Sequence, residues 1–170
     1  MRIGIAALIG LLAGGAASPS PVAAAELAQP AGPVILVVSG AIANTNGRGE
    51  ARFDQAMLEE LGVSALVTTT PWTDGRIRFE GVLARDLMAA VGAQGREVTA
   101  LALNDYKTTM PLADLQRPDV LLAFRQDGRA MPVRERGPIW VVYPVEPGTG
   151  VQSMETRAKM VWQLKELQVR

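Results

Sequence analysis

The complete absence of cysteine and histidine is the feature that most constrains this sequence. Without cysteine the chain forms no disulfide and offers no thiolate, and without histidine it has no imidazole base or ligand. Ser-His-Asp and Cys-His centres are excluded, as are zinc sites built from these residues. A chain without cross-links must be held together by its apolar core, and its side-chain chemistry is limited to oxygen and amine groups.

Residues 1–25 have the three-part layout of a secretory signal peptide. Arg2 is followed by an apolar run that ends at residue 17 and by a stretch of small residues that ends at Ala25. The apolar run is shorter than the roughly 20 residues that a membrane-spanning helix needs, and two prolines follow it. We therefore expect export, cleavage after Ala25, no membrane association afterwards, and a periplasmic or secreted location.

The charge of the mature chain is close to neutral. The whole sequence balances 17 basic against 17 acidic side chains, and the loss of Arg2 with the signal peptide leaves one negative charge in excess. No basic run is dense enough for a nucleic-acid or anionic-lipid surface, so neither is expected as a partner. Residues 26–33 are predicted to be a leader segment, and residues 34–170 are long enough for a single domain.

Short β-branched runs separated by turn residues dominate the mature sequence. Amphipathic helices are expected at residues 53–61, with Asp54 near the start and Gly62 at the end, and at residues 81–92. Strands are expected at residues 34–42, 63–70, 76–79, 98–103, 104–111, 120–124, 129–133 and 137–144. Because strands outnumber helices and do not strictly alternate with them, the sequence predicts a mixed α+β domain and not a doubly wound sheet.

The C-terminal stretch, residues 153–169, allows two interpretations. Met154, Ala158 and Val161 have a spacing that suits a helix. Residues 162–169 also suit a final strand. The sequence leaves both open.

Four segments, in this order along the chain, carry a family resemblance. They are PWTDGRIRFEGVLARDLM (71–88), LNDYKTTMPLADL (103–115), LLAFRQDGRAMPVRERGPIWVVYP (121–144) and VWQLKELQV (161–169). Together they resemble the oxidoreductase molybdopterin-binding domain, which has the sulfite oxidase type of fold, in a short exported form. The resemblance extends from residue 34 to the C-terminus and implies one mixed-sheet domain over residues 34–170.

Catalytic members of this family hold molybdenum through a cysteine thiolate that follows a strand. In this sequence the candidate positions are Thr68, Thr69 and Thr70. A threonine hydroxyl holds its proton far more tightly than a thiol and donates much less charge to a high-valent metal. The resemblance therefore implies the fold without the metal ligand. We predict no catalytic residue, no metal site and no resident cofactor, and molybdopterin is the candidate if a cofactor is bound.

Arg134 and Arg136 are the first candidate binding residues. If their segment is extended, residues two apart project to the same side and present two guanidinium groups together. Such a pair suits a phosphate or a carboxylate, and the resemblance places this segment beside the cofactor cleft. The alternative is that both arginines pair with acidic neighbours on the surface.

Trp72, Asn104, Asp105 and Tyr106 are the other candidates for ligand binding. Trp72 lies in a turn, where its ring could stack on a planar ligand or cap the core. The resemblance places Asn104, Asp105 and Tyr106 at the mouth of the cavity. A hairpin turn at Asn104 and Asp105, followed by a half-buried tyrosine, explains the same residues without a ligand.

These observations favour an exported, metal-free relative of the molybdopterin oxidoreductases that binds a small anionic or planar ligand or an exported partner protein. The main alternative is an oxidoreductase whose metal is held by the pterin, without a protein thiolate. A purely structural or signalling domain is the third interpretation. Metal analysis of the mature protein, and identification of the small molecules that copurify with it, would separate the three.

Overall fold

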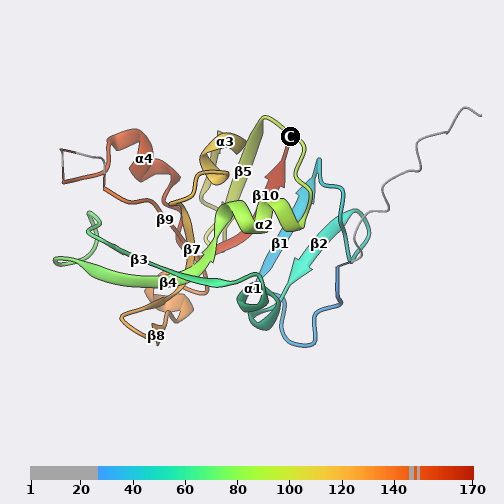
Figure 1. Cartoon of the computed structure of the whole chain (residues 1–170), viewed down its shortest axis with the longest axis horizontal. Helices are drawn as coiled ribbons and strands as arrows, with labels where there is room; N and C mark the ends of the chain where they lie inside the picture. The colour runs from blue at the N-terminus through green and yellow to red at the C-terminus, as the bar shows by residue number, and fades with distance from the viewer. Residues whose placement is uncertain (1–26, 146–147, 149) are drawn as a thin grey trace, which may run out of the picture.

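The computed structural model describes residues 27–145, 148 and 150–170, so the expected signal peptide lies outside the described residues. In this part of the chain the strands form two five-stranded sheets (Figure 1). The strands are β1 (Leu36–Gly40), β2 (Glu50–Phe53), β3 (Val63–Thr68), β4 (Ile77–Leu83), β5 (Glu97–Ala102), β6 (Lys107–Pro111), β7 (Leu121–Gln126), β8 (Arg129–Ala130), β9 (Trp140–Val142) and β10 (Leu164–Val169). The helices are α1 (Gln55–Glu60), α2 (Ala84–Ala90), α3 (Leu112–Leu115) and α4 (Met154–Lys159), with a 3-10 turn at Val133–Glu135.

The first sheet has the order β2-β1-β10-β5-β6. Its middle strand is the C-terminal β10, which pairs in parallel with β1 and antiparallel with β5. Val38 of β1 lies opposite Leu167 of β10, and both side chains are buried. The C-terminal stretch thus contains both elements that its sequence suggested, because helix α4 ends before strand β10 begins.

The second sheet has the order β3-β4-β7-β8, and β9 also pairs with β7. Residues 81–83, expected in the first turn of a helix, belong instead to β4, so that expectation is wrong at its start. The reason is Gly81, which lies against the backbone of β7 where a side chain would not fit. The helix itself is confirmed from Ala84 to Ala90.

Strand β2 has no counterpart among the expected strands. It is only four residues long, and its last residue, Phe53, was expected to begin the first helix. Ala51 and Phe53 are buried while Arg52 between them is exposed, which is the alternation of a strand with one buried face. An alternation this short is too weak a signal to predict a strand from sequence.

One apolar core joins the two sheets. Helix α2 buries Ala84, Leu87 and Met88, and Figure 1 shows it crossing in front of the first sheet. The β3-β4 hairpin projects to the left in the same view and ends near α4. No helix among the described residues is both long enough and apolar enough to span a membrane. The mixed sheets and short helices confirm the predicted α+β class.

The leader segment is bound to the fold through Asp54. One carboxylate oxygen of Asp54 accepts from the backbone N–H of Met57 at 2.9 Å and so caps α1. The other oxygen accepts from the backbone N–H groups of Ala31 and Gly32, at 2.8 and 2.7 Å. The hydrogen bonds from Met57 and Gly32 hold the pKa of this carboxyl below its ordinary value. Asp54 therefore fixes both the start of α1 and the path of the leader.

Replacement of Asp54 by alanine is expected to lower the melting temperature at neutral pH. Because the folded state lowers the pKa of Asp54, its contribution to stability is complete above the pKa of the unfolded chain and is lost as the pH falls through the folded pKa. The difference between wild type and Asp54→Ala should therefore shrink in acid. Thermal unfolding across the acid range measures it, with Asp54→Asn as a control that caps the helix without a titrating group. A difference that does not change with pH would contradict this role.

Candidate functional site

The turn between β3 and β4 is held by threonine hydroxyls. Thr70 is buried, and its hydroxyl lies 2.9 Å from the hydroxyl of Thr73 and accepts from the backbone N–H of Trp72 at 3.2 Å. The hydroxyl of Thr73 also accepts from the backbone N–H of Thr70. Such local bonds from hydroxyl to backbone are typical of tight turns. They fix the position of Trp72 at the tip of the hairpin.

The two preceding threonines bind the segment that follows β9. The hydroxyl of the buried Thr68 accepts from the backbone N–H of Val145 at 3.2 Å, and that of Thr69 donates to the carbonyl of Gly150 at 3.4 Å. The carbonyl of Thr69 accepts from the side-chain amide of Gln152 at 2.8 Å. The hydroxyls at all three positions where the family resemblance implies a metal ligand are thus engaged in the fold.

All three tryptophans of the chain form one cluster, which we call the tryptophan cluster: Trp72, Trp140 and Trp162. Their ring centroids are 5.1 to 6.3 Å apart, and each pair meets edge to face, a favourable aromatic geometry. Trp140 is fully buried, packs on Phe79 and donates its indole N–H to the carbonyl of Met160 at 3.2 Å. Trp140 is therefore a core residue, while Trp72 and Trp162 are half-buried at the edge of the core.

The expected extended geometry of Arg134 and Arg136 is wrong. Val133–Glu135 forms a 3-10 turn, and Arg136 follows it in the left-handed region with φ of 88°. A 3-10 helix has three residues per turn, so residues two apart do not project to the same side. The Arg134 side chain is 82% exposed and lies 3.3 Å from Glu135, as the surface-pair alternative predicts.

Arg136 instead joins the tryptophan cluster. Its guanidinium donates to the carbonyl of Trp72 at 2.8 Å. It also lies over the rings of Trp140 and Trp162, 5.1 and 5.8 Å from their centroids, which is a cation-π geometry. The backbone carbonyl of Arg136 accepts from the N–H of Gln163. This one residue connects the threonine turn, the 3-10 turn and the entry to β10.

Two pockets meet at Trp162. The larger, of about 830 Å³, is lined by polar residues that include Arg129, Arg134 and Arg136. Asp127 and Glu135 line it too, so its charge is mixed but mainly positive. Because Trp162 also lines the second pocket, the two candidate arginines lie next to the aromatic part of the site despite the change in their local geometry.

The second pocket, of about 300 Å³, is mostly aromatic and apolar. It brings together the predicted residues Trp72, Asn104 and Tyr106 with Trp162 and Arg157. Tyr106 is 46% exposed and donates its hydroxyl to the carbonyl of Ala158 in α4 at 2.9 Å. The side chain of Asn104 accepts from the backbone N–H of Tyr106, which orients the hairpin loop toward the pocket.

Asp105 does not join this pocket. It has φ of 63°, as expected for a hairpin turn, and its side chain is 86% exposed and paired with Lys165 at 3.1 Å. Arg157 lines the pocket although its sequence context did not single it out. Its Nε donates to the carbonyl of Gln152 at 2.9 Å. Only the packing of α4 beside β6 brings it to the site, and no local pattern predicts that contact.

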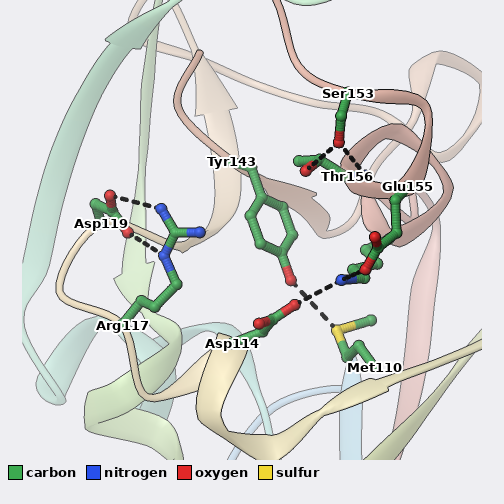
Figure 2. A network of polar contacts seen from close by, with 9 residues as sticks. Met110, Asp114, Arg117, Asp119, Tyr143, Ser153, Glu155 and Thr156 are labelled. Carbon is green, nitrogen blue, oxygen red and sulfur yellow. Dashed lines mark hydrogen bonds and ion pairs between the residues drawn. The ribbon is translucent and has the colours of Figure 1, made fainter. Parts of the chain in front are cut away.

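The carboxylates near α3 form ion pairs and do not offer a metal site (Figure 2). Asp114 pairs with Lys159 at 2.9 Å, and Lys159 also pairs with Glu155 at 2.7 Å. Desolvation of Lys159 opposes its charged form, but hydrogen bonds to Glu155 and Asp114 outweigh it and raise its pKa. Asp119 forms two hydrogen bonds with Arg117. Among the described residues, no three acidic side chains gather closely enough to hold a cation.

Tyr143 lies at the centre of the same network. Its ring is buried, and its hydroxyl donates to the sulfur of Met110 at 3.5 Å (Figure 2). Burial, followed by the charge of Asp114, raises the pKa of Tyr143 above its ordinary value, so the hydroxyl stays protonated. An oxygen held in this state is a poor metal ligand.

One of the comparisons with known proteins identifies a family, and another shows the same type of fold. A sequence model of the oxidoreductase molybdopterin binding domain matches residues 31–161, a range that includes all six predicted binding residues. The crystal structure of the sulfane dehydrogenase SoxCD from Paracoccus pantotrophus is similar, with a TM-score of 0.61 at 18% sequence identity. The match covers 79% of this chain and 37% of that chain, so the likeness concerns the fold of one part of that protein. No curated protein matches the sequence.

Proposed function

Because the chain belongs to the oxidoreductase molybdopterin-binding domain family, we propose that it is an exported member that binds a small planar anion and not a molybdenum centre ligated by the protein. The observation that carries the proposal is the pair of pockets that share Trp162, one aromatic and one rich in arginine. The expected signal peptide supports export to the periplasm or beyond.

The side chains of the site do not fit a protein-bound molybdenum. The chain contains no cysteine or histidine. The hydroxyls of Thr68, Thr69 and Thr70 hold backbone and neighbouring groups in place. A neutral alcohol in such a bond is a weak donor to a high-valent metal. We therefore assign no redox step to this site.

The aromatic pocket suits a planar heterocycle. Its volume of about 300 Å³ is at the lower end for small-molecule sites. Trp72, Trp162 and Tyr106 offer ring surfaces, and Asn104 and Arg157 offer polar groups for the edge of a ring. This combination of stacking and edge recognition suits a pterin or a ring of similar size.

The neighbouring arginines suit the anionic part of the same ligand. Arg129 is exposed and forms no ion pair in the described part of the chain, and Arg134 is paired only on the surface with Glu135. Guanidinium groups bind carboxylates and phosphates through two parallel hydrogen bonds. Arg136 is bound within the tryptophan cluster, so it shapes the site and leaves contact with the ligand to the other two arginines.

Intrinsic fluorescence gives a direct test, because every tryptophan of the chain belongs to the cluster. Titration of the mature protein with pterin carboxylate should quench this fluorescence in a saturable way. Tyr106→Ala should weaken binding about fivefold, since loss of one stacking contact costs about 1 kcal/mol. Arg134→Ala should also weaken it. Arg85→Ala removes a comparable exposed arginine from α2 and should change nothing.

Metal and cofactor analysis tests whether the protein binds molybdenum or a pterin when it is exported. The protein would be exported with its own signal peptide from a host that makes molybdopterin, purified, and examined for molybdenum and for extracted small molecules. Stoichiometric molybdenum with oxidase activity would establish the alternative, a pterin-dependent oxidoreductase that holds its metal without a protein thiolate. Absence of both quenching and copurifying ligand would contradict the binding role and favour a domain that binds an exported protein.

A further inference from the structure

Strand β3 is an edge strand without the protections that edge strands usually have. It pairs with β4 along all six residues without a shift in register, and no other strand of the described chain pairs with it. Its sequence, VSALVT, contains no charged residue, proline or glycine. Unpaired backbone groups along such an edge are a template for another strand.

The other edges of the two sheets differ from β3 in this respect. Strand β2 carries Glu50 and Arg52, which form an ion pair at 2.8 Å. Strand β6 begins with Lys107 and ends with Pro111. Strands β8 and β9 have only two and three residues. Charges, proline and short length all discourage pairing between edges, so β3 is the one edge strand in the described chain that has none of these features.

The exposed face of β3 is apolar. Val63 and Val67 are 49% and 45% exposed, and Ala65 between them is exposed as well. Residues two apart in a strand lie on one face, so these three side chains form a continuous strip. A neighbouring strand on the open edge would place its own side chains beside this strip and cover part of it.

The charges at the two ends of β3 are complementary. Glu60 is exposed shortly before the strand begins, and Arg76 is exposed beside its far end, where its guanidinium donates to the carbonyl of Val67 at 3.4 Å. Neither forms an ion pair within the described residues. When two copies of β3 run antiparallel, Glu60 of each copy comes near Arg76 of the other.

We infer that β3 pairs antiparallel with β3 of a second copy of this chain, and that the second sheet thereby continues across a symmetric dimer. An uncharged strand with opposite charges at its two ends is complementary to itself in this orientation, which is what a two-fold interface requires. The surface lies on the outer edge of the β3-β4 hairpin, so the inference does not depend on the proposed ligand.

Light scattering after size-exclusion chromatography of the mature protein, over a wide concentration range, tests the inference. The wild type should be a dimer. Ala65→Lys should raise the dissociation constant of the dimer by about tenfold or more, because it places a charge where β3 of one copy pairs with β3 of the other. Ala65 lies opposite Glu80 in β4, so lysine also gains a partner within the monomer and should leave its melting temperature unharmed. Ala65→Thr is the matched control, because threonine suits a strand, and it should keep the dimer.

Hydrogen exchange of residues 63–68 supplies a second measurement, which does not rely on a variant. Protection of these amides should increase with protein concentration if β3 pairs with itself. A wild type that is monomeric at every concentration, or a dimer that Ala65→Lys leaves intact, would overturn the inference. Assembly only with a different protein through this edge would overturn it as well.

Discussion

Gly81→Ala is expected to lower the free energy of unfolding by about 3 kcal/mol, or to prevent folding, because it places a methyl group inside the backbone of a neighbouring strand. A Cβ at this position would lie 2.0 Å from the carbonyl oxygen of Leu122 and 2.7 Å from the Cα of Ala123. Both are backbone atoms of β7, so no side-chain rotation relieves the overlap. Denaturant unfolding of the two proteins measures the change.

Gly32→Ala is the matched control for this prediction. A Cβ on Gly32 would meet only the side chain of Asp54, at an ordinary contact distance of 3.5 Å. Its backbone N–H, which donates to Asp54, is kept in the variant. The stability of Gly32→Ala should therefore stay close to that of the wild type. If Gly81→Ala were equally stable, β4 and β7 could not approach as closely as the structure shows.

The requirement for glycine at residue 81 could not be predicted from the sequence. The spacing of Leu83, Leu87 and Met88 favours a helix, and a glycine at residue 81 is compatible with a loop before it. The need for glycine comes from β7, about 40 residues later in the chain, and no local pattern carries that information. The apolar runs of β1, β3 and β7, by contrast, were predicted because their own residue types and the turn residues around them favour strands.

The candidate site shows the same division between local and long-range information. The sequence identified Trp72, Asn104 and Tyr106, which the structure places around one pocket. It could not identify Arg157, which reaches that pocket only through the packing of α4 near β6. The extended geometry expected around Arg136 was also wrong, because the segment forms a 3-10 turn followed by a left-handed residue, which changes the direction of the side chains.

The threonines at the end of β3 connect the sequence to the proposed function. At the positions where the family resemblance implies a cysteine, Thr68, Thr69 and Thr70 use their hydroxyls to bind backbone and to fix the tip of the hairpin. Trp72 is the residue that this turn positions, and its carbonyl receives the guanidinium of Arg136. These threonines thus stand beside an aromatic site held by Arg136, which is why we favour ligand binding over catalysis.

The tryptophan cluster predicts the second large effect: Trp140→Ala should lower the free energy of unfolding by about 3 to 5 kcal/mol, the usual cost of removing a fully buried aromatic ring. Trp140 is 0% exposed and contacts Phe79, Trp72 and Trp162, while Arg136 lies over its ring. The variant should therefore also loosen Trp72 and Trp162, with a red shift in the remaining tryptophan emission and weaker binding of pterin carboxylate.

Trp140→Phe separates the packing of the ring from its hydrogen bond. Phenylalanine keeps an aromatic ring against Phe79 but removes the indole N–H that donates to the carbonyl of Met160 at 3.2 Å. We expect a loss smaller than that of alanine, about 1 to 3 kcal/mol, since one buried carbonyl is left without its partner. Denaturant unfolding with fluorescence detection measures both variants. A decrease of less than about 1 kcal/mol in the free energy of unfolding of Trp140→Ala would contradict this prediction. Packing against Trp140 would then not be what holds Trp72 and Trp162 in place beside the aromatic pocket.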